Sequence, residues 1–537
     1  MNTRTKACAF LLAGCLTITT SFGLDVQGIC LVGNKQSVQK ECTQKGICSS
    51  VLSLPNAEAL ERKLHAYLEK PFSEELLVDL QKVIAKHYEE AGRPLVLVGI
   101  PEQEISSGCL QLTVTESKLG EVRVKGNQYF SEEGLKKHLG LNPGDPIDEK
   151  ALMQKVAYIN RNPYRKSQFV YTPGQEPDET DLELIVRDRE PFKFYIGSEN
   201  TGRKQLGRVR FFSGFQWGKA FGMEDHTFSY QAAFSENFVH YKGHTLNYTI
   251  YFPTKEVFQL FGGYSNVHAL PVDGLAQSHG FTVQGSMRCN IPIESKDPDF
   301  LQDFIYGFDF KRMNTTTEFT ALVTPRRHNV NLTQIALGYL GSLDTERFDM
   351  SVELNAFYSP GKWLGDQSAA DYSQLRPNTR PTYGYITTKL AGSYLMESDF
   401  TISGMVQSQW SPRNLMPSEQ ISLGGHNTVR GYDEGYVSTD MAFLASAELK
   451  TPSIRLIRSK RPFWKDSFQL LAFVDYALGT NHHTSPGVPK KKWLLSVGPG
   501  MRYNISTRFS VRFDWGMRLH DGGLRNSLVS FGTVMVF

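Results

Sequence analysis

Apolar residues near the start of the chain alternate between helical spacing and short β-like runs. Leucines spaced four residues apart predict a helix over 58–69, and Ser73 is a suitable N-cap for a second helix that ends at Gly92. The predicted strands around these helices lie at 24–32, 94–100 and 109–115. Residues 24–117 therefore predict a small α/β unit with the element order β-α-α-β-β.

The same order of elements recurs over residues 118–190. Ser131 and Asp148 are suitable N-caps for its two helices, and Pro173-Gly174 is typical of a turn between its last two strands. The predicted strands lie at 120–125, 168–172 and 181–187. The repeat lies in the order of elements rather than in residue identity, so the sequence predicts two small α/β units in tandem.

Each predicted unit has a three-stranded sheet with two helices on one face, which leaves a strand edge open. An open edge can bind an extended peptide through main-chain hydrogen bonds. The alternative is a spacer domain whose edge is capped, and element order alone does not separate the two. We place the docking edge in the second strand of the first unit, at Leu95, Val96, Leu97 and Val98.

From Pro191 onward, strict alternation of apolar and polar residues replaces the helical pattern. Near the end of the chain, for example, Phe513 and Trp515 fall on one face while Arg512 and Asp514 fall on the other. Aromatic residues on one face and charges on the opposite face suit strands that separate lipid from a wet lumen. The region holds about 16 antiparallel strands at roughly 10 residues each. We therefore predict an all-β membrane barrel behind the two α/β units.

The last eight residues, from Ser530 to Phe537, end the chain on an aromatic residue. Gly532, Met535 and Phe537 have the spacing that is common at the end of outer-membrane barrels, where the barrel assembly machinery recognises it. A soluble β protein has no reason to end on an exposed phenylalanine. These three residues are therefore a candidate barrel-assembly signal.

The first residues are typical of an export signal. Arg4 and Lys6 are followed by a mostly apolar run over 7–18. Small residues at Ser21-Phe22-Gly23 suit cleavage by ordinary signal peptidase, while the run that ends at Cys15 also resembles a lipoprotein box. The apolar run continues past Cys15, which favours ordinary cleavage. We expect residues 1–23 to be a signal peptide, so that the protein leaves the cytoplasm.

The composition of the chain limits which classes of partner and function are expected. The 58 basic and 55 acidic residues nearly cancel, so nothing favours a nucleic-acid partner. The mean hydropathy of −0.33 is compatible with a barrel, because barrel strands alternate between lipid and lumen and average out as polar. Nucleotide-binding, zinc-protease and serine-hydrolase motifs are lacking, so we expect no enzyme activity and no cofactor.

The mature chain has five cysteines, and an oxidising compartment permits disulfides between them. They are Cys30, Cys42, Cys48, Cys109 and Cys289. Four of the five lie before residue 110, which predicts a bridged N-terminal domain, but the sequence leaves the pairing open. Their spacing does not resemble that of a zinc site.

One glycine-rich segment, residues 424–432, interrupts the alternation and carries a family resemblance. Its Val429-Arg430-Gly431-Tyr432 resembles the Val-Arg-Gly-Tyr/Phe motif of the outer-membrane superfamily that contains POTRA domains. The segment 473–477 resembles the Phe-x-Asp-x-Gly motif of that superfamily, with Ala477 in place of the glycine. Further similarities occur at 100–101, 108, 110–115, 164–190 and 448–452. Two POTRA-like units favour the ShlB/FhaC/HecB two-partner secretion transporters, also called the TpsB class.

The resemblance implies that Arg430 lies on a loop that folds back into the barrel and meets an aspartate on the inner wall. The alternation over 468–476 puts Asp475 on the lumen side, so it is a plausible partner. Such a pair would tether the loop, because a guanidinium fits a carboxylate bidentately and Gly431 permits a tight backbone turn. The alternative is a surface hairpin whose arginine is solvated.

The resemblance also implies an outer-membrane pore that secretes a large exoprotein captured by periplasmic POTRA domains. The implied domains are a signal peptide, two POTRA domains at 24–117 and 118–190, and a barrel over 191–537. Expected partners are the exoprotein, the barrel assembly machinery and lipid or lipopolysaccharide. The alternatives are an assembly factor of the same superfamily and a passive porin or adhesin. The signal leads almost directly into the first strand, so no plug helix is expected.

Overall fold

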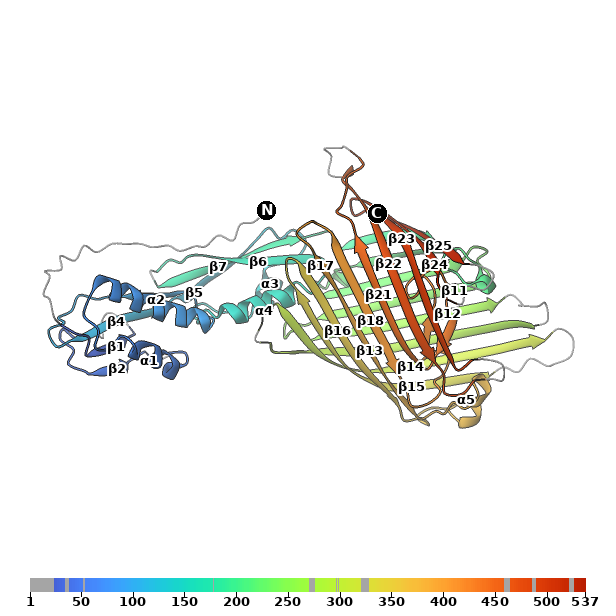
Figure 1. The fold of residues 1–537 in the computed structure, drawn as a ribbon, viewed down its shortest axis with the longest axis horizontal. Coiled ribbons are helices and arrows are strands. Elements are labelled where there is room, and N and C mark those ends of the chain that lie inside the picture. Colours follow the sequence, from blue (N-terminus) through green and yellow to red (C-terminus); the bar gives the residue numbers. More distant parts are fainter. Residues whose placement is uncertain are drawn as a thin grey trace. The chain divides into compact units, whose positions relative to one another are not determined.

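The first α/β unit of the computed structural model is a sheet with two helices packed on one face (Figure 1). The structure describes residues 24–537 except for 34–37, 52–53, 177, 270–275, 296, 298, 320–327, 458–463, 485–488 and 521–525. Elements of the first unit are β1 (Gly28–Val32), β2 (Gly46–Ser49), α1 (Ala57–His65), α2 (Glu74–Glu90), β3 (Val96–Gly99) and β4 (Cys109–Glu116). Among the described residues the sheet has four strands in the order β2-β1-β4-β3, one more than the sequence predicts.

The additional strand β2 pairs in parallel with β1, which in turn pairs in parallel with β4. Alternation along β1 and β4 sends Ile29 and Leu112 into the core beneath the helices and sends Cys30 and Gln111 to the opposite face. The predicted N-cap of α2 is confirmed, because the Ser73 side chain accepts a hydrogen bond from the backbone N–H of Leu76. Helix α1 ends at His65, earlier than predicted.

The second α/β unit follows directly along the chain. Its elements are β5 (Lys118–Lys125), α3 (Glu132–Leu139), α4 (Glu149–Ile159), β6 (Arg165–Pro173) and β7 (Glu179–Asp188). Within the described part of the chain its sheet has three strands in the order β5-β7-β6. Both predicted N-caps are present: Ser131 accepts a hydrogen bond from the Gly134 N–H, and Asp148 accepts one from the Ala151 N–H at 2.9 Å.

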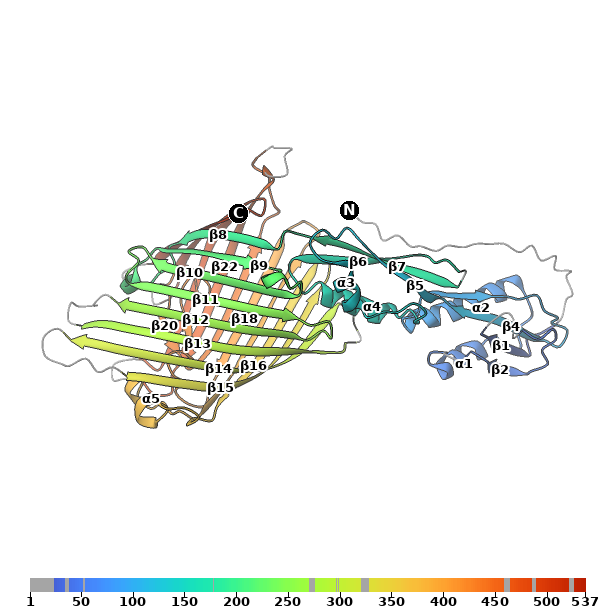
Figure 2. The ribbon, with the colours of Figure 1, turned by 180° about the vertical axis from the view of Figure 1, so that it is seen from behind.

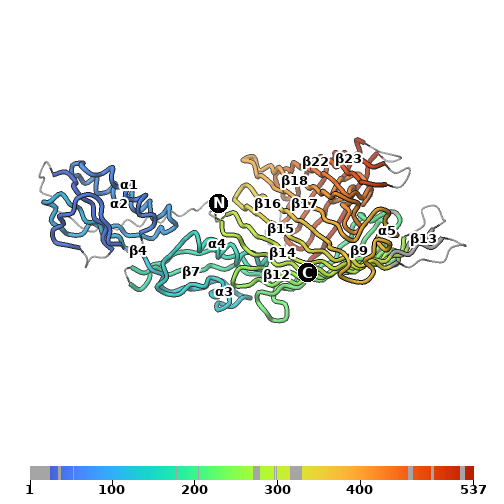
Figure 3. The backbone as a smooth tube through the Cα atoms, turned by 90° about the horizontal axis from the view of Figure 1, so that it is seen from below, coloured from blue at the N-terminus to red at the C-terminus, as the bar shows by residue number. Residues whose placement is uncertain are grey.

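In the part of the chain that the structure describes, sixteen antiparallel strands close into a barrel, as the alternation predicts (Figures 1 and 2). Most strands pair with their neighbours in sequence, which the colour gradient of the wall shows in Figure 3. They are β8 (Phe192–Glu199), β9 (Arg210–Trp217), β10 (His226–Ser235), β11 (Tyr241–Tyr251), β12 (Val257–Ala269), β13 (Ala276–Ile293), β14 (Phe300–Phe319), β15 (His328–Asp344), β16 (Phe348–Ser359), β17 (Tyr383–Leu395), β18 (Thr401–Trp410), β21 (Met441–Lys450), β22 (Asp466–Thr480), β23 (Lys491–Ile505), β24 (Phe509–Arg518) and β25 (Ser527–Val536).

Side chains alternate between the two faces of the barrel wall. On β22, Leu470 and Val474 are exposed on the outside, whereas Leu471, Phe473 and Asp475 are buried inside. Large apolar residues are exposed in the same way on most other strands, which suits a lipid-facing surface. Among the described residues, no helix combines the length and apolarity needed to cross a membrane.

The barrel closes where β25 pairs with β8. The register runs from Gly532 opposite Glu199 to Val536 opposite Tyr195. Beyond the strand, the Phe537 N–H donates to the carbonyl of Phe194 at 2.8 Å, and the two rings lie 6.2 Å apart. The terminal residues thus form the seam of the barrel.

Candidate functional site

Between β18 and β21 the chain leaves the wall and forms a separate hairpin inside the barrel. Strands β19 (Ile421–Leu423) and β20 (Val437–Thr439) pair with each other and not with the wall. Residues 424–436 between them form the loop tip. Its apolar side chains pack against residues of β21, β22 and β23 that alternate with exposed outward residues. The inward fold of this loop therefore agrees with the geometry that the resemblance implies.

The loop tip touches the inner wall through its backbone. Gly431 has a φ of +91°, in the left-handed region that favours glycine. A Cβ atom on Gly431 would lie 2.8 Å from the backbone of Gly516 on β24, and a Cβ on Gly516 would lie 2.3 Å from the Gly431 nitrogen. Both positions thus require glycine. Gly516 could not be identified from the sequence, because its requirement for glycine arises only where the loop contacts the wall.

Arg430 and Asp475 form a buried bidentate pair. The Arg430 Nε donates to Asp475 Oδ2 at 2.7 Å, and Nη2 donates to Asp475 Oδ1 at 2.7 Å. The backbone N–H of Arg430 also donates to Oδ2 at 3.0 Å, so one carboxylate holds both the side chain and the main chain of the loop. Both residues are almost entirely buried. The structure thus brings the two predicted residues together.

Further groups on the wall complete the surroundings of the guanidinium. Nη1 donates to Glu448 of β21, Nη2 donates to the Ser446 hydroxyl at 3.3 Å, and the guanidinium carbon lies 3.5 Å from the centre of the Phe473 ring. A third carboxylate, on Asp514 of β24, lies 3.6 Å from Nη1. A buried charge needs such partners, because desolvating it alone costs several kcal/mol. Sequence reasoning identified one of the three carboxylates.

Val429 and Tyr432 flank the pair and are fully buried. Val429 belongs to the apolar cluster with Leu444 of β21 and Leu494 of β23. The Tyr432 hydroxyl accepts from the Leu495 N–H at 3.3 Å and donates to a backbone carbonyl, with Leu495 and His520 offering the acceptors. All four motif residues therefore contact the inner wall, each through a different kind of interaction.

Two further buried carboxylates, which no sequence pattern predicts, lie at the base of the hairpin. Glu419 accepts from Lys311 Nζ at 2.7 Å and from the Tyr385 hydroxyl at 2.8 Å. Asp440 accepts from Arg376, which follows the short helix α5 (Ala369–Leu375) beside β15 (Figure 2). These residues lie in irregular segments without alternation, so no local pattern distinguishes them.

The predicted docking edge lies in an edge strand of the first unit. Strand β3 pairs only with β4 in the described sheet, and Leu95 lies just before it, where its carbonyl accepts from the Ser117 N–H at 2.9 Å. The carbonyl of Val98 accepts from Gln81 Nε2 of α2 at 2.8 Å. Because alternate residues of a strand present their polar groups to the same side, Val96 faces the same edge as Val98.

The remaining predicted residues fall in two places. Gly532 and Met535 lie in β25, and Phe537 follows it at the seam; Met535 and Phe537 are exposed on the barrel. The predicted signal peptide, residues 1–23, and with it the question of Cys15, lies outside the described residues.

The comparisons with known proteins agree with this architecture. A model described as haemolysin secretion/activation protein ShlB/FhaC/HecB matches residues 178–503, a ShlB-type POTRA domain matches 49–117, and a POTRA model described as surface antigen variable number repeat matches 117–189. The heme/hemopexin transporter protein HuxB of Haemophilus influenzae is 21% identical over 89% of this chain and 83% of its own. The outer membrane transporter CdiB of Dickeya dadantii is 23% identical over 69% of this chain and 65% of its own.

Solved structures show the same fold. CdiB from Escherichia coli superposes with a TM-score of 0.77 at 17% identity, covering 97% of this chain and 93% of its own. CdiB from Acinetobacter baumannii superposes with a TM-score of 0.68 at 15% identity, covering 97% of this chain and 91% of its own. With a family model that spans most of the chain, two POTRA matches and a closed barrel, the protein belongs to the ShlB/FhaC/HecB family of outer-membrane secretion transporters.

Proposed function

We propose that this protein captures an unfolded exoprotein at its periplasmic POTRA units and conducts it outward through the barrel. The observation that carries the proposal is the hairpin that occupies the barrel interior and is fixed to the wall at Arg430 and Asp475. The names of its relatives, a heme/hemopexin transporter protein and outer membrane transporters, support a transport role. The exoprotein is the partner that the family implies.

The Arg430–Asp475 pair acts as a tether for the loop tip. A buried ion pair contributes little net stability, because its attraction is offset by the desolvation of both groups. Its bidentate geometry, reinforced by the backbone N–H of Arg430, instead fixes one position and one orientation of the loop. Such a tether sets the resting state of the pore, which must change when a polypeptide passes.

Capture takes place by strand addition at β3. Val96 offers its N–H and carbonyl to the open edge, while the exposed side chain of Leu97 offers apolar contact. The Val98 carbonyl is engaged by Gln81, so an incoming strand either bonds upstream of it or displaces that amide. Leu95, Val96, Leu97 and Val98 are thus the proposed docking segment.

The proposed domain boundaries follow the sequence analysis: signal peptide 1–23, POTRA domains 24–117 and 118–190, and barrel 191–537. The apolar outer face of the barrel contacts lipid and lipopolysaccharide. Gly532, Met535 and Phe537 form the signal that the barrel assembly machinery reads, which their place at the seam and the exposure of the last two support.

Deleting the gene and comparing secreted proteins with outer-membrane composition tests the proposal. We expect one large secreted protein to disappear from the medium while the set of outer-membrane proteins is unchanged. A general loss of barrel proteins would instead identify an assembly factor. No change in either fraction would indicate a passive porin or an adhesin.

A further inference from the structure

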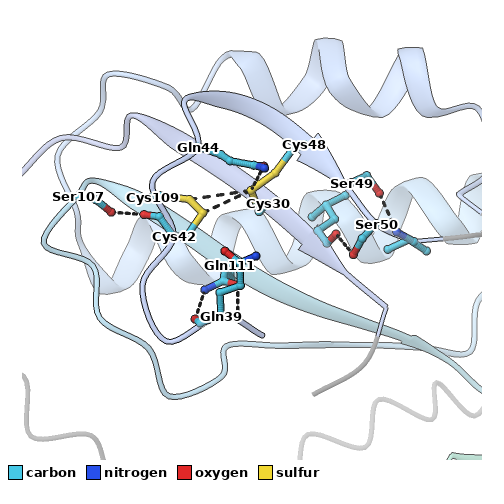
Figure 4. The surroundings of a disulfide bond; sticks show 12 residues. Cys30, Gln39, Cys42, Gln44, Cys48, Ser49, Ser50, Ser107, Cys109 and Gln111 are labelled. Atoms are coloured by element: carbon cyan, nitrogen blue, oxygen red, sulfur yellow. Dashed lines mark hydrogen bonds between the residues drawn. A yellow bond between two sulfur atoms is a disulfide. The ribbon is translucent and has the colours of Figure 1, made fainter. Parts of the chain in front are cut away.

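Four cysteines of the first unit gather on the sheet face opposite the helices (Figure 4). They form the bridges Cys30–Cys48 and Cys42–Cys109, which join β1 to β2 and join the segment 38–44 to β4. Cys30, Cys42 and Cys109 are almost completely buried. The unit therefore encloses three of the four cysteines and leaves Cys48 half-buried beside them, although the residues are spread over 80 positions of sequence.

The two bridges lie against each other. Cys30 Sγ lies 3.6 Å from Cys42 Sγ and 3.9 Å from Cys109 Sγ. Four thiolates around one Zn²⁺ at about 2.3 Å form a tetrahedron whose edges are about 3.8 Å long. The two distances from Cys30 Sγ to the other bridge thus match edges of such a site, and the sulfur atoms of Cys30, Cys42 and Cys109 all lie within 4.8 Å of one another. To complete the tetrahedron, the sulfur atoms within each bridge would separate and Cys48 Sγ would move towards the other three.

We propose that the thiol form of this unit binds one thiophilic cation, with Zn²⁺ as the reference ion, through Cys30, Cys42, Cys48 and Cys109. The metal form and the disulfide form exclude each other, because each uses all four sulfur atoms. From the thiols, four S–H bonds lose their protons as four Zn–S bonds form. From the bridges, two dithiol molecules supply four electrons, become cyclic disulfides and release four protons, while both S–S bonds break.

The surroundings suit a closed structural site. Three strands and one covering segment supply the ligands, and Gln39 and Gln111 hold that segment to β4 through hydrogen bonds of 2.7 and 2.9 Å. The side-chain amide of Gln44 lies beside Cys30, with its oxygen 3.3 Å from Sγ. With the amide turned over, its N–H₂ group would donate to a thiolate ligand at this position. A groove of about 810 Å³ lined by Cys30, Cys42 and Cys48 gives an ion a path from solvent.

The thiol form exists before the bridges are made and again when a dithiol reduces them. In both situations a bound cation would hold β2 and the segment 38–44 against the sheet, as the bridges do in the oxidised form, because ligands from separate segments fold around the metal. The first POTRA unit would then stay folded in either redox state. The inference concerns this centre alone and does not depend on the transport function proposed above.

Cobalt titration of the full-length mature protein in detergent tests the site. The protein is reduced with dithiothreitol, desalted without oxygen and titrated with Co²⁺, which absorbs through thiolate charge transfer and tetrahedral d–d bands. We expect saturation at one equivalent, displacement of Co²⁺ by Zn²⁺, and no bands in the oxidised protein. Circular dichroism of each sample verifies that the chain remains folded.

Two variants complete the test. Cys42→Ser should abolish saturation at one equivalent, whereas Cys289→Ser, which removes the one free cysteine among the described residues, should leave the titration unchanged. Absence of tetrahedral bands in the folded, reduced wild-type protein would overturn the proposal. Identical titrations of wild type and Cys42→Ser would overturn it equally, because they would place the cobalt elsewhere.

Discussion

Gly431 of the loop tip and Gly516 of β24 lie backbone against backbone, so close that a Cβ atom on Gly516 would come within 2.3 Å of the Gly431 nitrogen. The wall is therefore shaped to receive the loop. This contact lies next to the Arg430–Asp475 pair in the loop tip, and the glycine contact and the ion pair together define the position of the tip. Separate substitutions can test the glycine contact and the ion pair.

Gly516→Ala should displace the loop tip without opening the barrel wall. The added methyl group has only backbone atoms of the loop to push against, so the tip must move. We expect a heat-modifiable, assembled barrel whose conductance in planar bilayers rises. Gly285→Ala is the matched control, because nothing lies within 4 Å of its added Cβ. Wild-type conductance in Gly516→Ala would contradict the close approach.

Arg430→Ala should leave an assembled barrel that exports poorly. The substitution leaves Asp475 buried without its cation, at a cost of about 3–5 kcal/mol for the docked loop, whereas Asp514 and Glu448 keep the cations of other wall residues. The amount of exoprotein in the medium measures the effect. The double variant Arg430→Ala/Asp475→Ala should destabilise the docked loop less than the two single variants do in sum. Wild-type export by assembled Arg430→Ala would refute the tether.

Val96→Pro should weaken exoprotein capture while the barrel still assembles. Proline removes the N–H that faces the open edge of β3 but no hydrogen bond to β4. Binding of the secretion domain of the exoprotein to the purified transporter measures capture. Val96→Ala keeps the N–H and serves as the control. Equal affinity of both variants and wild type would rule out this strand as the docking edge.

Arg376→Ala should release the α5 segment from the base of the hairpin. Arg376 donates to Asp440 and to the Leu415 carbonyl, so it joins the segment after α5 to residues that are far away in sequence. We expect faster cleavage between residues 360 and 382 by protease added to intact cells. Arg380→Ala removes an exposed arginine of the same segment, and the protease should cleave this variant at the wild-type rate. Equal cleavage of both variants would show that the ion pair does not hold the segment.

Removing the Cys42–Cys109 bridge should destabilise the first unit more than removing Cys30–Cys48. The Cys42–Cys109 bridge joins residues 67 positions apart, and the Cys30–Cys48 bridge joins residues 18 positions apart. In the chain-entropy model, the longer loop adds about 4 kcal/mol to the free energy of unfolding and the shorter loop adds about 3 kcal/mol. Pulse proteolysis in urea of the paired Cys→Ser variants gives the two midpoints. The opposite order would show that local packing, rather than loop length, decides the stability.

The periodicity of apolar and polar residues was sufficient to predict much of the fold. Alternation indicates which side chains of β22 face inward, and that is why Asp475 could be assigned to the lumen before Arg430 was placed. The strand β2 could not be found in the same way, because Gly46–Ser49 is short and follows an irregular polar segment. Its partner is the parallel strand β1, and parallel pairing carries no turn signal in the sequence.

The rest of the site depends on contacts between distant segments. Gly516 resembles any other wall glycine until the loop, more than 80 residues earlier, rests on it. Glu448, Glu419 and Asp440 are ordinary polar residues by type and spacing, and their importance comes from the cations that meet them. A single sequence shows none of these contacts. It therefore identifies the motif arginine but only some of the wall residues that bind the loop.

The seam between β25 and β8 also imposes an order on biogenesis. Ser198 and Thr533, whose side chains meet across it, are 335 positions apart, so the cylinder cannot close until the final residues have been delivered. Until then β8 and the most recently added strand both keep unpaired edges, which are prone to incorrect pairing. Closure therefore depends on β25: a polypeptide without this strand would keep two unpaired strand edges and would not form the closed cylinder.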